Sequence, residues 1–205
     1  MTVPDLASVE AAARAELDPI FAARETAIAN GRKVIRCSAQ AIRSGHRGEV
    51  EVAMTLLGEA RTLLDESTLA MADRPGINIG ILNDAAKEYA EARLYLALAS
   101  HEELPTAADL GITMVPYLKG LGEAVGELRR RLLDQLRGED FDEAERLLAV
   151  MDEVVDLLAA LDYPDGMTGG LRRTTDVARS LTERSRADLT SALVAERLRR
   201  DLGRR

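Results

Sequence analysis

Apolar residues recur at helical spacing along most of the 205-residue chain, and the breaks between them predict about six or seven helices. The first predicted helix opens at Pro4 and continues to about Ile42. Its first half carries apolar residues at Leu6, Val9, Ala13, Leu17, Ile20 and Phe21. This spacing is typical of a helix that buries one face.

The later breaks contain glycine, proline or small polar residues. They fall at residues 44–48, 73–76, 100–113 and 163–170. The second predicted helix runs to about residue 71. The next three cover residues 79–100, 114–138 and 140–161, and the last runs from residue 171 towards the C-terminus. Thr106 and Asp109 have the spacing of a capping box for one short turn. Because short connections favour antiparallel neighbours, we predict one all-α domain over residues 1–205, folded as an antiparallel bundle.

Composition supports this fold class. Only 3% of the residues are aromatic and none is Trp, whereas Ala, Leu, Arg and Glu dominate. The single Cys37 rules out an internal disulfide framework. No apolar run approaches the roughly 18 residues of a membrane span, so we expect a cytoplasmic protein with no membrane partner.

Charge is distributed unevenly. The net charge is −8, but residues 171–205 carry ten Arg against five acids, which leaves −13 on residues 1–170. An acidic body argues against a protein that coats DNA uniformly, while local basic tracks could still meet phosphates.

Several familiar chemistries are not expected. The two histidines, His46 and His101, lie far apart in the sequence with no ligand cluster beside them, so we expect both at the surface and neither on zinc. No glycine-rich loop follows a strand, and no GxSxG motif occurs. Dinucleotide binding and nucleophilic catalysis are therefore not predicted.

The positions of the acidic residues are more informative about function. Glu88 and Glu91 share one face of the third predicted helix with Asp84, and Glu123 and Glu127 are four residues apart on the fourth. If these two helices pack antiparallel, four carboxylates can converge, and oxygen ligands of this kind suit Mg²⁺ or Mn²⁺. Two such ions can activate a water at a phosphodiester.

The simpler interpretation is a set of solvated surface acids paired along their own helices, Lys87 with Glu91 and Glu127 with Arg131. Three glycines at positions 120, 122 and 126 surround the second acid pair. Each costs a helix roughly 1 kcal/mol relative to Ala. We therefore expect another backbone or a substrate to approach that face closely.

Two segments resemble the translin family, in particular its translin-associated factor X branch. These are Lys87–Ala92 (KEYAEA) and Tyr117–Leu128 (YLKGLGEAVGEL). The similarity continues through Arg137–Asp140, is close from Lys87 to Leu161, and is looser in the first two helices. The resemblance implies an all-α subunit of a hollow shell, often of eight subunits, that binds single-stranded RNA or DNA.

In the factor X branch, acids at the positions of Glu88, Glu91, Glu123 and Glu127 hold a divalent metal and cut single-stranded RNA endonucleolytically. All four positions are acidic here, but the branch has Asp at the position of Glu123, whereas translin itself, a poor or inactive nuclease, resembles this chain there. One methylene moves a carboxylate by roughly 1 Å, enough to reshape a metal site. Because one short chain combines features of both branches, we expect a prokaryotic homo-oligomer.

Basic residues supply candidate nucleic-acid contacts. They form a stripe on the first helix and a group just after the second acid pair. The stripe contains Arg32, Lys33, Arg36 and Arg43, and the group contains Arg129, Arg130 and Arg131. Arginines of this kind could hold phosphates and direct a strand towards the acids, although solubilising surface charge explains each one equally well.

The leading hypothesis is a translin-like protein that binds single-stranded nucleic acid and cuts RNA with Mg²⁺ or Mn²⁺. The second hypothesis is a binding and assembly protein in which the four acids are structural. The third is a helical adaptor with no nucleic-acid role. Arginines that neutralise the acids would favour the second hypothesis.

Overall fold

The structure, a computed structural model, describes residues 6–72 and 80–203. These residues contain seven helices and no strand, which confirms the predicted all-α fold. The helices are α1 (Leu6–His46), α2 (Val50–Met71), α3 (Gly80–Ala99), α4 (Met114–Arg137), α5 (Phe141–Ala159), α6 (Asp165–Thr168) and α7 (Leu171–Gly203). The predicted break at residues 73–76 lies outside the described residues.

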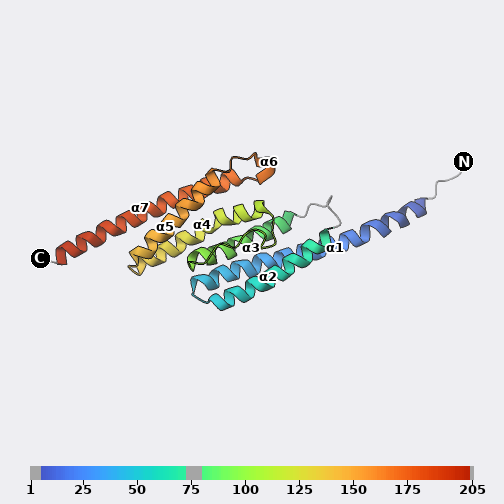
Figure 1. Cartoon of the computed structure of the whole chain (residues 1–205). Helices are drawn as coiled ribbons and strands as arrows, with labels where there is room; N and C mark the ends of the chain where they lie inside the picture. Colours follow the sequence, from blue (N-terminus) through green and yellow to red (C-terminus); the bar gives the residue numbers. More distant parts are fainter. Residues whose placement is uncertain (1–5, 73–79, 204–205) are drawn as a thin grey trace.

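The long helices form a bundle in which α1 packs between α2 and α3, and α4 packs between α3 and the pair formed by α5 and α7 (Figure 1). A continuous core of apolar side chains runs through these contacts. None of the described helices combines the length and the apolarity that crossing a membrane requires.

Sequential neighbours α1 and α2, α4 and α5, and α5 and α7 run antiparallel, as expected for short connections (Figure 1). Helices α3 and α4 instead run in the same direction. Gly120 lies against the backbone of Lys87 and Glu91, and Glu127, two turns further along α4, is joined through His46 to Tyr95, one turn beyond Glu91 on α3. The expectation that this pair is antiparallel is wrong, because residues 100–113 return along the bundle before α4 begins.

This returning connection is held by specific contacts. Thr106 and Asp109 form the predicted capping box, in which the Asp109 amide donates to Thr106 Oγ1 at 3.1 Å and the Thr106 amide donates to Asp109 Oδ2 at 2.8 Å. Arg61 of α2 donates to the Asp109 carbonyl at 2.9 Å, and Tyr117 of α4 donates to the Pro105 carbonyl at 3.0 Å. The connection therefore has a fixed place against both helices.

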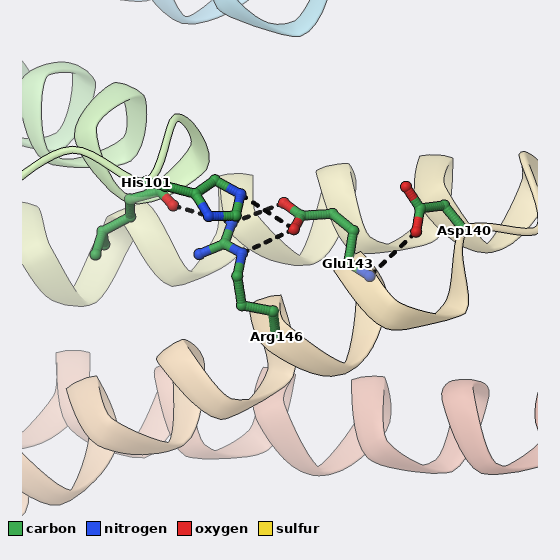
Figure 2. A network of polar contacts seen from close by, with 5 residues as sticks. His101, Asp140, Glu143 and Arg146 are labelled. Atoms are coloured by element: carbon green, nitrogen blue, oxygen red, sulfur yellow. Dashed lines mark hydrogen bonds and ion pairs between the residues drawn. The ribbon is translucent and has the colours of Figure 1, made fainter.

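A polar network joins the end of α3 to the start of α5 (Figure 2). The Asp140 side chain caps α5 by accepting from the Glu143 amide at 3.2 Å. The Glu143 carboxylate pairs with Arg146 at 2.7 Å and with His101 at 3.2 Å, and Arg146 also donates to the Leu98 carbonyl at 3.2 Å. His101 is exposed, as predicted.

The first half of α1 projects from the bundle, as does the end of α7 at the opposite side (Figure 1). Leu6, Val9, Leu17 and Phe21 are 57–69% exposed, so the prediction that they are buried is wrong for the single chain. No other described element packs beside this part of α1, and buried positions begin only at Ala27. The apolar stripe exists, but within one chain it has nothing to cover it.

Two glycines of α4 give opposite predictions for stability. A Cβ at Gly120 would lie 2.7 Å from the Lys87 carbonyl and the Glu91 amide, and backbone of this kind cannot yield cheaply. A Cβ at Gly126 would meet only Leu181, at 3.8 Å. We expect Gly120→Ala to lower the free energy of unfolding by about 1–3 kcal/mol. Gly126→Ala should raise it by up to about 1 kcal/mol.

Urea denaturation of the two variants, which carry the same chemical change six residues apart on one helix, measures both effects. Equal shifts of the two midpoints would contradict the close contact between α3 and α4.

Candidate functional site

Three carboxylates meet where α3 packs against α4. One oxygen from each of Glu88, Glu91 and Glu123 lies within 4.8 Å of the other two, and all three residues are half-buried. The contact at Gly120 brings the two backbones close enough for this, so the expected close approach is observed at that glycine. Asp84, one turn earlier on α3, is exposed and lies outside this acid cluster.

Glu91 is the most perturbed of these acids. Burial, together with the negative charges of Glu88, Glu123 and Glu127, raises the pKa of its carboxyl to about 8. The residues that the structure describes provide no hydrogen bond or ion pair to this carboxylate. Glu91 is therefore a buried acid whose ionisation would be favoured by an additional cation.

Lys87 partly neutralises the other two members of the acid cluster. Its ammonium lies 2.7 Å from Glu123 Oε2 and 3.3 Å from Glu88 Oε1, with the side chain only 18% exposed. Burial disfavours the ammonium, but the contacts with Glu123 and Glu88 outweigh it and raise the pKa of Lys87. The surface pairing of Lys87 with Glu91, considered from the sequence, is replaced by a pairing across two helices.

Glu127 lies beside the acid cluster but has a different partner. Its Oε2 atom is 2.6 Å from His46 Nε2, and His46 Nδ1 is 3.0 Å from the Tyr95 hydroxyl. The prediction that His46 is a surface residue is wrong, because α3 and α4 cover its ring and leave its side chain 5% exposed. The hydrogen bond from His46 is the main cause of the lowered pKa of Glu127.

A cavity of about 650 Å³ opens next to the acid cluster, between α4 and the start of α7. Glu91 and Glu123 line one side, and Lys119 and Arg173 line the cavity with them. Lys119 donates to the Gly169 carbonyl at 3.1 Å, and Arg173 is exposed. Sequence reasoning missed both cations, since 54 positions separate them and only the packing of α7 brings them together.

The predicted basic residues are placed unequally. Arg32, Lys33, Arg36 and Arg43 are all exposed on α1. On α4, Arg130 is exposed. Arg129 instead lies against α7, where it pairs with Asp188 at 2.8 Å and donates to Ser185 at 2.9 Å. Arg129 therefore serves the α4–α7 contact, and the exposed members of the predicted basic set lie mainly on α1.

Sequence comparison identifies one curated relative and no matching family model. The relative is an uncharacterized protein of Methanocaldococcus jannaschii, 28% identical over 127 residues. The matched part is 62% of this chain and 57% of that protein.

Comparison with solved structures gives longer matches. The structure of AfC3PO in complex with duplex RNA is 37% identical, with a TM-score of 0.81, over 89% of this chain and 95% of that one. The crystal structure of AfC3PO is 35% identical over the same shares, with a TM-score of 0.80. The crystal structure of apo-NeC3PO, with a TM-score of 0.79 over 94% and 99% of the two chains, is 18% identical and shows the shared fold alone.

Proposed function

The chain belongs to the translin family, which includes the C3PO structures that it matches at 35% and 37% identity, and from this premise we propose a metal-dependent endoribonuclease that binds single-stranded nucleic acid. The observation that carries the catalytic part is the convergence of Glu88, Glu91 and Glu123 within 4.8 Å. A carboxyl with a pKa near 8 inside that cluster marks a place where a cation would be stabilising.

The donor set fits Mg²⁺ or Mn²⁺. All three side chains offer carboxylate oxygens, the hard ligands that these ions prefer, and small side-chain rotations would bring them onto one ion. Glu127, adjacent to the cluster and ionised, is the fourth candidate ligand. A divalent ion bound there would supply an activated water and neutralise charge at the phosphodiester.

The chain's own cations complete the site. Lys119 and Arg173 line the cavity next to the acids, at a suitable position to hold the phosphates on either side of the bond to be cut. Lys87, which already contacts Glu123 and Glu88, limits the negative charge of the cluster when no metal is bound. The test is incubation of the purified protein with labelled single-stranded RNA in Mn²⁺, Mg²⁺ or EDTA.

The second candidate is a nucleic-acid-binding oligomer without catalysis. It is favoured by the Lys87 pairing, which stabilises Glu88 and Glu123 without a metal, and by Glu rather than Asp at position 123. Intact RNA in every arm of that incubation, with retained RNA binding, would support this candidate and contradict the enzyme.

Nucleic-acid binding is proposed to use the exposed stripe on α1. It ends at Arg43, one turn before His46, which contacts Glu127, so the stripe leads to the edge of the acid cluster. Because bases are exposed only in single strands, we expect duplex RNA to compete poorly. AfC3PO has been solved with duplex RNA, so equal competition by a duplex would refute this preference.

Binding should weaken steeply with salt, since counterions are released when arginines meet phosphates. Replacing Arg32 and Arg36 together by Ala should reduce the slope of log K against log salt by about 1.4, roughly 0.7 for each lost contact with a single strand. Fluorescence anisotropy with labelled RNA at several salt concentrations measures the slope. A matched control replaces Arg14 and Arg24, which are exposed on the same helix but paired with Glu10 and Glu25.

Assembly into a homo-oligomer, of eight subunits if the family pattern holds, is proposed from the projecting half of α1. An exposed stripe of large apolar side chains at 57–69% exposure is a face that a second copy would cover. We expect Leu17→Glu with Phe21→Glu to shift the molar mass in light scattering towards the 22.3 kDa monomer. A wild-type mass of 22.3 kDa at micromolar concentration would refute the assembly.

A further inference from the structure

His46 joins α1 to the acidic face of α4 through a buried chain of hydrogen bonds. Its ring lies 4.8 Å from the ring of Tyr95, a residue with no exposed surface. Nδ1 is 3.0 Å from the Tyr95 hydroxyl, and Nε2 is 2.6 Å from Glu127 Oε2. Neither the sequence pattern nor the catalytic proposal above gives these hydrogen bonds a function.

The direction of each hydrogen bond follows from what its partners can do. The Tyr95 hydroxyl carries one proton, and its oxygen lies 3.0 Å from His46 Nδ1. In a neutral ring whose Nδ1 is unprotonated, this hydroxyl donates its proton to Nδ1. With Nδ1 accepting, the ring proton sits on Nε2 and is donated to Glu127.

The hydrogen bond between His46 and Glu127 independently places the ring proton on Nε2. Glu127 Oε2 lies 2.6 Å from His46 Nε2, and a carboxylate oxygen only accepts hydrogen bonds. Its partner, Nε2, must then carry a proton. The neutral ring with its proton on Nε2 thus satisfies both hydrogen bonds together.

We propose that His46 is a positioning residue, which holds the Glu127 carboxylate in one orientation beside Glu88, Glu91 and Glu123 and is itself held by Tyr95. This inference rests on the proposed metal site. A carboxylate fixed in advance loses less side-chain freedom when an ion binds, and outer partners of metal ligands commonly change metal affinity 10–100-fold.

Manganese titration of the full-length protein, followed by electron paramagnetic resonance of free Mn²⁺, tests the proposal without RNA. We expect His46→Phe, which keeps a ring but loses both nitrogens, to bind Mn²⁺ about 10–100-fold more weakly. His46→Gln, whose amide can replace the Nε2 donor, should recover most of the affinity. His101→Asn is the control, because His101 is exposed on a left-handed backbone position that Asn tolerates.

Nitrogen-15 NMR of the imidazole supplies a second measurement that needs no metal and no variant. We expect the wild-type His46 resonances to show the Nε2–H tautomer, and Tyr95→Phe to lose this preference. Should His46→Phe fail to fold, Mn²⁺ binding by Tyr95→Phe replaces it, with a several-fold weaker affinity expected.

Wild-type Mn²⁺ affinity in a folded His46→Phe protein, or the Nδ1–H tautomer in the wild type, would overturn the positioning role while leaving the metal site in place. A wild-type protein that binds no Mn²⁺ would instead overturn the proposed metal site, and the role of His46 with it.

Discussion

Replacing Glu91 by Gln is expected to reduce Mn²⁺-dependent cleavage of single-stranded RNA at least about 100-fold. This loss is larger than the loss expected when an outer partner of a metal ligand is removed. The change removes one carboxylate charge from the cluster with almost no change in shape. At pH 8.5, where this carboxyl is ionised, it should also raise the melting temperature of the metal-free protein, because a buried charge next to three other acids disappears.

Lost cleavage together with higher stability distinguishes a metal site from a structural cluster, since removal of a structural ion pair lowers stability. Asp84→Asn is the matched control, an exposed acid on the same helix that lies outside the cluster, and it should cleave like the wild type. Glu123→Asp tests the geometric argument, and faster cleavage is expected if the longer side chain misplaces its carboxylate. Metal-dependent cleavage that survives Glu91→Gln would refute the site.

The free energy of unfolding should fall as pH rises from about 4.5 to 8. The Glu91 carboxyl has a pKa of about 8 in the folded chain and an ordinary value of 4.5, so the folded state holds its proton more tightly. Its stabilising contribution is complete below the unfolded pKa and is lost as pH rises through the folded one. Each unit of pKa difference corresponds to about 1.4 kcal/mol, before screening by solvent.

Urea denaturation at several pH values measures this dependence, and Glu91→Gln should flatten it. Glu127 and Glu143 have lowered pKa values, so their contributions are lost only when pH falls below this range. Saturating Mn²⁺ should reverse the trend, because the ion binds the deprotonated carboxylate and stabilises the protein more at higher pH. A pH dependence that is identical in wild type and variant would contradict the placement of Glu91.

The sequence predicted those parts of the site that are encoded locally. The spacing of Glu88 with Glu91, and of Glu123 with Glu127, fixes which acids share a helix face. Glycine at position 120 destabilises a helix relative to Ala, and this predicted that another backbone approaches there. The structure shows that this backbone belongs to α3. Local periodicity also gave the bounds of the six long helices to within a few residues, whereas the short α6 lies inside the predicted break at residues 163–170.

The rest depends on which helices are neighbours, and that information is spread over the whole chain. His46 and Glu127 are 81 positions apart, so no local pattern could show that the histidine is buried against the acid. The pairing of Arg129 with Asp188 could not be predicted for the same reason, because these residues are also far apart in the sequence. The direction of α3 relative to α4 was mispredicted because the connection at residues 100–113 was treated like the shorter ones, which favour antiparallel neighbours, whereas it returns along the bundle.

This return of the chain also determines the dipole of the bundle. With α3 and α4 aligned, and with Gly122 facing Thr174 and Gly126 facing Leu181 in the same order along α7, the N-termini of three long helices point the same way. The peptide dipoles of these three helices add, whereas those of α2 and α5, which run the other way, oppose them. At the cavity, the positive end of α7 lies next to Arg173 and Lys119, so a phosphate that enters there meets positive charge beside the acids.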